Sequence, residues 1–201
     1  FLALEWLPGP DLQRRITEQG PLSIDDTIRI ATQATDVLAF LHADGVIHRD
    51  LKPSNFSFDP DGSLRLIDLG LALDPAASPG LTAPGAFLGT VGYVAPEVAA
   101  GRPGTARSDL YGLGAVLYAC LTGRPPHVGT TDRTVLRRQA RDSVPSPSLL
   151  RAGIPPAFSE LVSALLEVEP ERRPRDAAGV MEALRALGGL AAERGVFASA
   201  P

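Results

Sequence analysis

Most of residues 108–121 are apolar, and Asp109 is the only charged residue among them. If this run is a helix, apolar side chains lie on nearly every face of it, so other elements must cover it on all sides. We therefore expect a central helix around which the rest of the chain folds. A buried carboxylate is costly unless it is hydrogen-bonded, so Asp109 is expected to accept backbone N–H groups.

Shorter patterns predict the elements around this helix. A helix should begin after Ser23, where residues 23–26 have the spacing of a capping box, and should run to about His42. Its apolar face is expected to consist of Ile24, Ile28, Ala31, Leu38 and Leu41. Two stripes of similar spacing predict two surface helices near the end of the chain: Phe158, Leu161, Val162, Leu165 and Leu166, and then Val180, Met181, Leu184 and Leu187.

Alternating residues predict a β-hairpin. Phe56 and Phe58 alternate with polar residues, residues 59–62 have the composition of a turn, and Leu64 and Leu66 alternate again. Three further segments complete the prediction. Residues 1–6 are expected to form a strand, residues 73–86 a surface loop, and residues 144–148 a plain connection.

The overall composition excludes several classes of function. The formal net charge is −4 with no long run of one sign, so no nucleic-acid partner is expected. No run reaches the ~18 apolar residues of a membrane span, so no membrane contact is expected from this segment. Cys120 is the only cysteine, which excludes an intramolecular disulfide and fits a reducing, cytoplasmic setting. The only methionine is Met181, so we expect that the chain was cut from a longer protein, which could carry a membrane anchor elsewhere.

The strongest chemical signature lies between the first predicted helix and the hairpin. Residues 48–55 read HRDLKPSN, on a loop held between two rigid elements, which is a favourable place for catalysis. This octapeptide resembles the catalytic loop of protein kinases, and its DLKPxN form resembles the serine/threonine branch. The resemblance extends over nearly the whole chain and points to bacterial serine/threonine kinases of the Hanks type.

Three segments downstream carry the same resemblance. IDLG at residues 67–70 resembles the magnesium-binding Asp-Phe-Gly motif, with Leu69 in place of the usual phenylalanine. GTVGYVAPE at residues 89–97 resembles the segment that receives the substrate hydroxyl and ends in Ala-Pro-Glu. PERRP at residues 170–174 resembles a late motif of the family, whose arginine pairs with the carboxylate of Ala-Pro-Glu.

The resemblance implies a role for each of these residues. Asp50 would orient the substrate hydroxyl and accept its proton, with Lys52 beside the transferred phosphoryl group and Thr90 bracing both. Asn55 and Asp68 would hold Mg²⁺, which prefers oxygen ligands, and with it ATP. Structural roles are implied for five residues: His48, Arg49, Asp109, Glu97 and Arg173. Among them, Glu97 and Arg173 would form a pair, and Asp109 would bind the backbone of the catalytic loop.

The start of the chain resembles the hinge that binds adenine in this family. Glu5 and Leu7 would bind the base through their backbone, and Leu4 would stand at the gatekeeper position. Asp11 would meet the ribose. These positions would complete the ATP site from the hinge side.

One check on the catalytic loop does not depend on the family. Lys52 is the only lysine in the chain, and Asn55 is the only asparagine. A compact ammonium group and a neutral carbonyl ligand are not reproduced by arginine or by an apolar residue. Their retention inside one octapeptide indicates a chemical role there.

Together these expectations describe an α+β fold: a protein-kinase-like C-terminal lobe, mainly helical with a small β-hairpin. We expect a partial kinase domain at residues 1–187 and an Ala/Gly-rich tail or linker at residues 188–201. The sequence contains neither a glycine-rich phosphate loop nor the lysine that accompanies it on a strand. An N-terminal lobe is therefore expected as a missing partner, and the chain alone is expected to be inactive.

The expected function is ATP- and Mg²⁺-dependent phosphorylation of serine or threonine in a protein substrate. Two alternatives remain open: a pseudokinase or truncated binding module, and a stable helical remnant without activity. The presence of Asp50, Lys52, Asn55 and Asp68 together favours the enzyme, because a binding module has no chemical need for all four. In the loop at residues 73–86, Thr82 is either a regulatory phosphosite or an ordinary loop residue.

Overall fold

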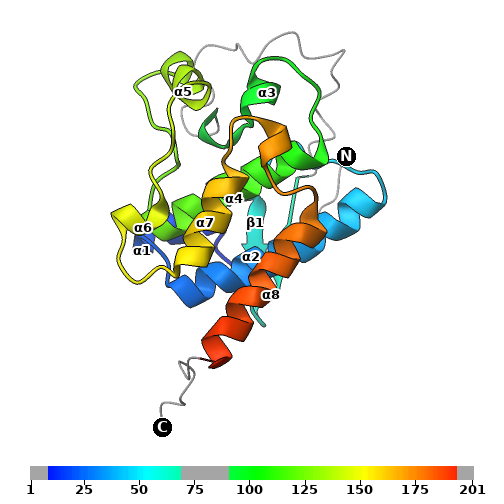
Figure 1. Ribbon diagram of the computed structural model, residues 1–201, viewed down its shortest axis with the longest axis vertical. Coiled ribbons are helices and arrows are strands. Elements are labelled where there is room, and N and C mark those ends of the chain that lie inside the picture. The colour runs from blue at the N-terminus through cyan, green and yellow to red at the C-terminus, as the bar shows by residue number, and fades with distance from the viewer. Residues whose placement is uncertain (1–8, 69–90, 194–201) are drawn as a thin grey trace.

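The chain folds around one central helix. The computed structural model describes residues 9–68 and 91–193, and within them the fold is mainly helical with one two-stranded sheet. The helices are α1 (Leu12–Gln19), α2 (Ile24–Ala43), α3 (Pro96–Ala99), α4 (Ala106–Thr122), α5 (Asp132–Gln139), α6 (Pro147–Leu150), α7 (Pro156–Leu165) and α8 (Ala177–Glu193). The strands are β1 (Phe56–Phe58) and β2 (Leu64–Leu66), and the short 3-10 helices are η1 (Pro53–Asn55), η2 (Val91–Tyr93) and η3 (Pro170–Arg172). Figure 1 shows α4 crossing the middle of the molecule.

The central helix α4 is the one that the sequence predicts. All of its residues from 108 to 121 are buried, and both α2 and α7 pack against it. Thr105 and Ser108 form a capping box at its N-terminus, and Gly123, with a φ of 77°, ends it in the left-handed conformation. The prediction of a helix covered on all sides is therefore confirmed.

Two glycines let other elements approach the backbone of α4. A Cβ on Gly112 would lie 2.8 Å from the Cβ of Leu51, and a Cβ on Gly114 would lie 2.6 Å from the Cβ of Leu165. Both distances are too short for carbon atoms in contact. The two glycines therefore allow the loop that contains Leu51, and the helix α7, to lie directly on α4.

The helix α2 has nearly the predicted ends, but its N-terminus differs in detail. Ser23 accepts the backbone N–H of Asp26 at 3.0 Å, as an N-cap residue should. The carboxylate of Asp26 accepts the hydroxyl of Ser23 at 2.7 Å. The expected capping box is thus present only in its first half.

The buried face of α2 also differs from the prediction. Its buried residues are Thr27, Ile30, Ala31, Ala34, Thr35 and Leu38. Ile24, Ile28 and Leu41 are only partly buried, so the predicted face was wrong in part. The hydroxyls of Thr27 and Thr35 donate to the carbonyls of Ser23 and Ala31, which allows these polar side chains to enter the core.

The hairpin forms as predicted, and its register is clear. Phe56 pairs with Leu66 and Phe58 with Leu64 in an antiparallel ladder. Gly62, with a φ of 84°, donates its N–H to the carbonyl of Asp59 at 2.9 Å and closes the turn. The hairpin begins directly after η1, so it fixes the end of the loop that carries the chemical signature.

The two late surface helices are confirmed as α7 and α8, and all nine residues of their predicted stripes are buried. The sequence did not predict α1 or α5, because each has only two buried residues and so no apolar stripe. The segment expected to be a plain connection, residues 144–148, enters the short helix α6. There a proline at the first helical position favours a turn of helix.

The predictions for the two ends of the chain and for the loop at residues 73–86 are less fully tested. The helix α8 continues to Glu193, past the boundary expected after residue 187. The expected strand at residues 1–6 and the expected loop at residues 73–86 lie outside the described residues. None of the helices in the described part of the chain combines the length and hydropathy that a bilayer span requires.

Candidate active site

The loop at residues 48–55 is tied to the central helix by one buried carboxylate. Asp109 accepts the backbone N–H of His48 at 2.8 Å and that of Arg49 at 2.9 Å. These are the bonds that the sequence predicted for it. Its Oδ2 also lies 2.9 Å from Nε2 of His42, at the end of α2. Asp109 therefore connects α4, α2 and the loop through a single side chain.

His48 connects the same loop to the end of the hairpin. Its side chain is fully buried, its Nδ1 accepts the N–H of Asp50 at 3.3 Å, and its Nε2 lies 3.2 Å from the carbonyl of Ile67. Because Nδ1 accepts, Nε2 carries the proton and donates to that carbonyl. Burial lowers the pKa of His48 below its ordinary value, against the raising effect of Asp109. The neutral ring is thus the form that fits these bonds.

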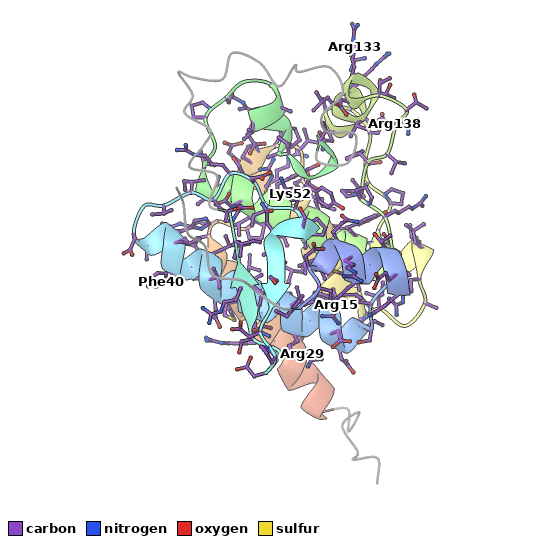
Figure 2. All side chains as sticks on the ribbon, turned by 180° about the vertical axis from the view of Figure 1, so that it is seen from behind. Arg15, Arg29, Phe40, Lys52, Arg133 and Arg138 are labelled. Atoms are coloured by element: carbon purple, nitrogen blue, oxygen red, sulfur yellow. The ribbon has the colours of Figure 1, made fainter. Side chains whose placement is uncertain are left out.

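Two side chains of the loop, those of Lys52 and Asn55, converge on the carboxylate of Asp50. Lys52 Nζ lies 2.6 Å from Asp50 Oδ2, and Asn55 Nδ2 donates to the same oxygen at 3.1 Å and to the carbonyl of Asp50 at 2.8 Å. The side chains of Lys52 and Asp50 are 19% and 28% exposed, so the pair is reachable from solvent. Figure 2 shows Lys52 near the middle of the molecule, above β1. Here a carboxylate, an ammonium group and an amide meet at a solvent-accessible point.

Two residues of the site have a backbone conformation that is unusual for their type. Arg49 has a φ of 69° and Asp68 a φ of 56°, both in the left-handed region. Such conformations cost free energy, on the order of 1 kcal/mol or more each, and cluster at functional sites. Asp68 is exposed and follows Ile67, whose N–H donates to the carbonyl of Asn55 at 2.9 Å. The backbone thus links the segment of Asp68 to the catalytic loop.

Asn55 and Asp68 have the chemistry of magnesium ligands. Because Asn55 Nδ2 donates to Asp50, the amide is oriented with Oδ1 as its remaining acceptor. Carboxylate and amide oxygens suit Mg²⁺, which usually takes one or two protein ligands and completes its shell with phosphates and water. In the described residues no cluster of three or more His, Cys, Asp or Glu side chains could hold a metal by itself. Asn55 and Asp68 could together supply two oxygen ligands of a Mg²⁺ ion.

A second ion pair lies away from the loop and is fully enclosed. Arg173 donates to Glu97 Oε1 at 2.6 Å and to Oε2 at 2.7 Å, and the side chains are 0% and 4% exposed. Its remaining N–H groups donate to the carbonyls of Glu167, Arg107 and Val168. Burial would raise the pKa of Glu97, but the hydrogen bonds from Arg173, from a backbone N–H and from Ser108, together with the charge of Arg173, outweigh burial and hold this pKa below its ordinary value. The family resemblance implied this pair, which joins α3 to the residue at the end of η3.

Several predicted site residues lie elsewhere or cannot be placed. Glu5, Leu7, Thr82 and Thr90 fall outside the described residues. Asp11, expected at the ribose, is the N-cap of α1, where Oδ1 accepts the N–H of Arg14 at 2.7 Å. Its place in a ribose site stays a prediction.

Sequence reasoning missed two partners in this network. His42 was expected only to mark the end of a helix, yet its Nε2 lies 2.9 Å from the carboxylate of Asp109, which is 67 positions away in the chain. Ser108 was missed as well, and its Oγ donates to Glu97 Oε1 at 3.0 Å. A helix end or a capping residue gives no signal about a partner that only the folded chain brings near.

The comparisons with known proteins agree with this geometry. The family model described as the protein kinase domain matches residues 1–185. The chain is 40% identical over 176 residues to the serine/threonine-protein kinase PkaA of Streptomyces coelicolor, covering 86% of this chain and 32% of that protein. It is 35% identical over 178 residues to PknB of Mycobacterium leprae, covering 89% and 29%.

A solved structure is similar in fold. The crystal structure of Rad53 1-466 in complex with AMP-PNP has a TM-score of 0.71 and 28% identity, covering 88% of this chain and 44% of that one. The chain spans between about a quarter and a half of the length of the curated relatives it matches. The family match nevertheless covers nearly all of it. The chain belongs to the protein kinase family.

Proposed function

We propose that this chain is the C-terminal catalytic lobe of a serine/threonine protein kinase, transferring the γ-phosphoryl group of ATP to hydroxyl groups of a protein substrate. The observation that carries the proposal is the contact of Asp50 with Lys52 and Asn55 at a solvent-accessible point. The loop that bears them is held by Asp109 and His48. Similarity to named serine/threonine-protein kinases supports the assignment.

In the proposed reaction Asp50 orients the substrate hydroxyl and accepts its proton as the new O–P bond forms, while the bond between the γ-phosphorus and the bridging oxygen breaks and ADP leaves. Lys52, now paired with Asp50, would place its positive charge near the transferred phosphoryl group. Asn55 Oδ1 and the Asp68 carboxylate would hold Mg²⁺, which neutralises phosphate charge when bound. Thr90 would brace Asp50 and Lys52. Positioning and charge neutralisation are the main sources of catalysis in this reaction class.

We further propose that the ATP site is completed by residues at the start of the chain and by groups that this sequence does not contain. Backbone groups of Glu5 and Leu7 would bind the adenine, and Asp11 the ribose. The sequence has no glycine-rich phosphate loop and no lysine other than Lys52. A separate N-terminal lobe would supply those groups, and residues 1–187 would then be part of a larger kinase domain.

The test is to compare two proteins in one assay. Residues 1–201 alone, and the same residues joined to the native sequence upstream of them, are incubated with radiolabelled Mg-ATP and a generic basic protein. We expect transfer to serine or threonine by the joined protein and very slow transfer by the 201 residues alone. If the joined protein binds ATP but transfers nothing, the alternative reading as a pseudokinase or binding module holds. Equal transfer by both would contradict the need for a second lobe.

A further inference from the structure

A groove between α3 and α5 lies outside the residues that the proposed reaction uses. Its cavity volume is about 650 Å³. The apolar part of its lining comes from the α3 side and from α5 and its C-cap: Pro96, Ala99, Ala100, Leu136 and Ala140. In Figure 1, α3 and α5 lie at the top of the molecule, at the opposite end from the last turns of α8. The groove therefore has an apolar floor that is open to solvent.

Three arginines line the same groove: Arg133, Arg137 and Arg141. They recur every fourth residue, so their side chains follow one side of the helix and the turn after it. All three are exposed, and none of their guanidinium groups forms a hydrogen bond or ion pair with another described residue. Like charges at this spacing destabilise a helix. This arginine stripe therefore has a cost in the free protein and is complementary to an anionic partner.

The helix that carries the arginine stripe is firmly anchored on its other side. Val135 and Gln139 are 5% and 1% exposed, and Gln139 Nε2 donates to the carbonyl of Val91 in η2 at 2.9 Å. Arg138, which does not line the groove, donates to the carbonyl of Val128. Figure 2 shows Arg133 extending from α5 away from the body of the molecule. The stripe is thus presented on a fixed support.

We propose that this groove docks an acidic segment of the protein substrate, with carboxylates on the arginine stripe and an apolar side chain on the floor. Guanidinium groups pair well with carboxylates, and complementary charge favours both encounter and register. The groove adjoins α3 and η2, the last part of the segment expected to receive the substrate hydroxyl. That the docked protein is a substrate rests on the proposed kinase function; that the groove binds an acidic segment does not.

Binding is tested directly, without phosphoryl transfer. A fluorescent peptide with glutamates on both sides of one leucine is titrated with the protein, and anisotropy is measured. The variant Arg133→Ala/Arg137→Ala/Arg141→Ala should bind it about tenfold more weakly or worse. A control with the same loss of charge, Arg29→Ala/Arg175→Ala/Arg185→Ala, removes exposed arginines outside the groove and should change binding less than about twofold. Equal weakening by both variants would overturn the proposal.

Two exchanges separate groove binding from general attraction to anions. Arg133→Glu/Arg137→Glu should lose the acidic peptide and gain the matching peptide with lysines, which a merely unfolded variant could not do. Replacing the leucine of the peptide with serine should weaken binding to the wild type. If the serine peptide, or heparin, binds as tightly as the leucine peptide, the arginines attract any polyanion and the groove is no docking site for a protein segment.

A kinetic measurement then connects docking to the reaction. With a substrate that carries the acidic segment, the triple alanine variant should raise KM about as much as it weakens peptide binding and leave kcat nearly unchanged. If the peptide binds as described but no variant transfers phosphate, docking stands and the kinase function fails. If the triple alanine variant transfers phosphate with the same KM as the wild type, the proposal that the substrate docks in this groove is overturned.

Discussion

Two ion pairs of the same length have opposite surroundings in this molecule. Asp50 and Lys52 lie 2.6 Å apart with side chains 28% and 19% exposed, while Glu97 and Arg173 lie 2.6 Å apart and are 4% and 0% exposed. The enclosed pair is saturated, because every N–H of Arg173 has an acceptor among the described residues. The open pair keeps access to solvent and hence to a substrate. Burial, more than pairing itself, separates a structural contact from a chemical one.

The supports of the two pairs differ in the same way. Glu97 and Arg173 are held by elements far apart in the sequence, α3 and η3, and Ser108 of α4 joins them. Asp50 and Lys52 lie on one loop, and Asp109 holds the backbone of that loop in position. Loss of the enclosed pair should therefore lower stability, and loss of the open pair should lower turnover.

The largest expected effect is that of Asp50→Asn on turnover. The change keeps the shape of the side chain but removes the group that accepts the proton, so kcat should fall about a hundred- to ten-thousand-fold. Because Asp50 is partly exposed, the free energy of unfolding should change by less than about 1 kcal/mol. Steady-state kinetics and urea unfolding measure the two quantities. Near-normal kcat would remove Asp50 from the reaction.

The next effect is that of Arg173→Ala on stability. Removing one partner leaves the Glu97 carboxylate buried without its charge partner, which should cost about 3–5 kcal/mol in the free energy of unfolding. Arg175→Ala is the matched control: its side chain is 90% exposed, so the cost should be within about 0.5 kcal/mol. Equal unfolding midpoints for the two variants would show that the enclosed pair contributes nothing.

Asp109→Ala should act on both stability and the catalytic loop. It leaves the N–H groups of His48 and Arg49 without their acceptor, at a cost of roughly 1–3 kcal/mol. In this variant, hydrogen exchange of the His48 and Arg49 amides should be faster than in the wild type, by a larger factor than for the amides of α2. Unchanged protection of both amides would mean that something other than Asp109 holds the loop.

The smallest effect is a dependence of stability on pH. The pKa of His48 is lowered by burial, so below a pH of about 6.5 the unfolded chain takes up a proton before the folded chain does, and stability falls. The slope is at most about 1.4 kcal/mol per pH unit for each such histidine. His127, whose pKa burial also lowers, contributes in the same range. His48→Gln should reduce the slope in chemical unfolding; an unchanged slope would contradict this assignment.

Glu97 gives a separate acidic range. Its pKa is held below the ordinary value of 4.5, so its contribution to stability is present above that pH and is lost as the pH falls through the pKa of the folded state. The Arg173→Ala variant should lack this second loss. The two ranges let the open loop and the enclosed pair be distinguished in a single pH series.

The sequence predicted most of the helices and strands whose apolar residues follow a strong local pattern. The central helix follows from a long apolar run, the hairpin from alternation, and the last two helices from apolar stripes at helical spacing. The cost of a buried carboxylate predicted that Asp109 accepts backbone N–H groups, and the family resemblance implied those of the catalytic loop. The buried face of α2 was predicted only in part, because Thr27 and Thr35 satisfy their hydroxyls within the helix. Local hydropathy cannot report such a bond.

Other features could not be predicted because they arise only when distant segments meet. The contact of His42 with Asp109 and the carbonyls that surround Arg173 depend on the packing of α2, α4 and η3. The groove between α3 and α5 likewise joins segments that no single pattern connects. Asp11 is a different case, because an aspartate can either contact a ribose or cap a helix. The cap became visible only in the fold.

The most direct test of the account measures turnover and stability together in Asp50→Asn and Arg173→Ala. Both variants, joined to the N-terminal lobe that the proposed function requires, are assayed for phosphoryl transfer per folded molecule and unfolded in urea under the same conditions. We expect Asp50→Asn to remain as stable as the wild type and to lose transfer, and Arg173→Ala to unfold at lower urea while its folded fraction keeps most of its transfer. The reverse pattern, or loss of both properties in both variants, would contradict the division between an open chemical pair and an enclosed structural one.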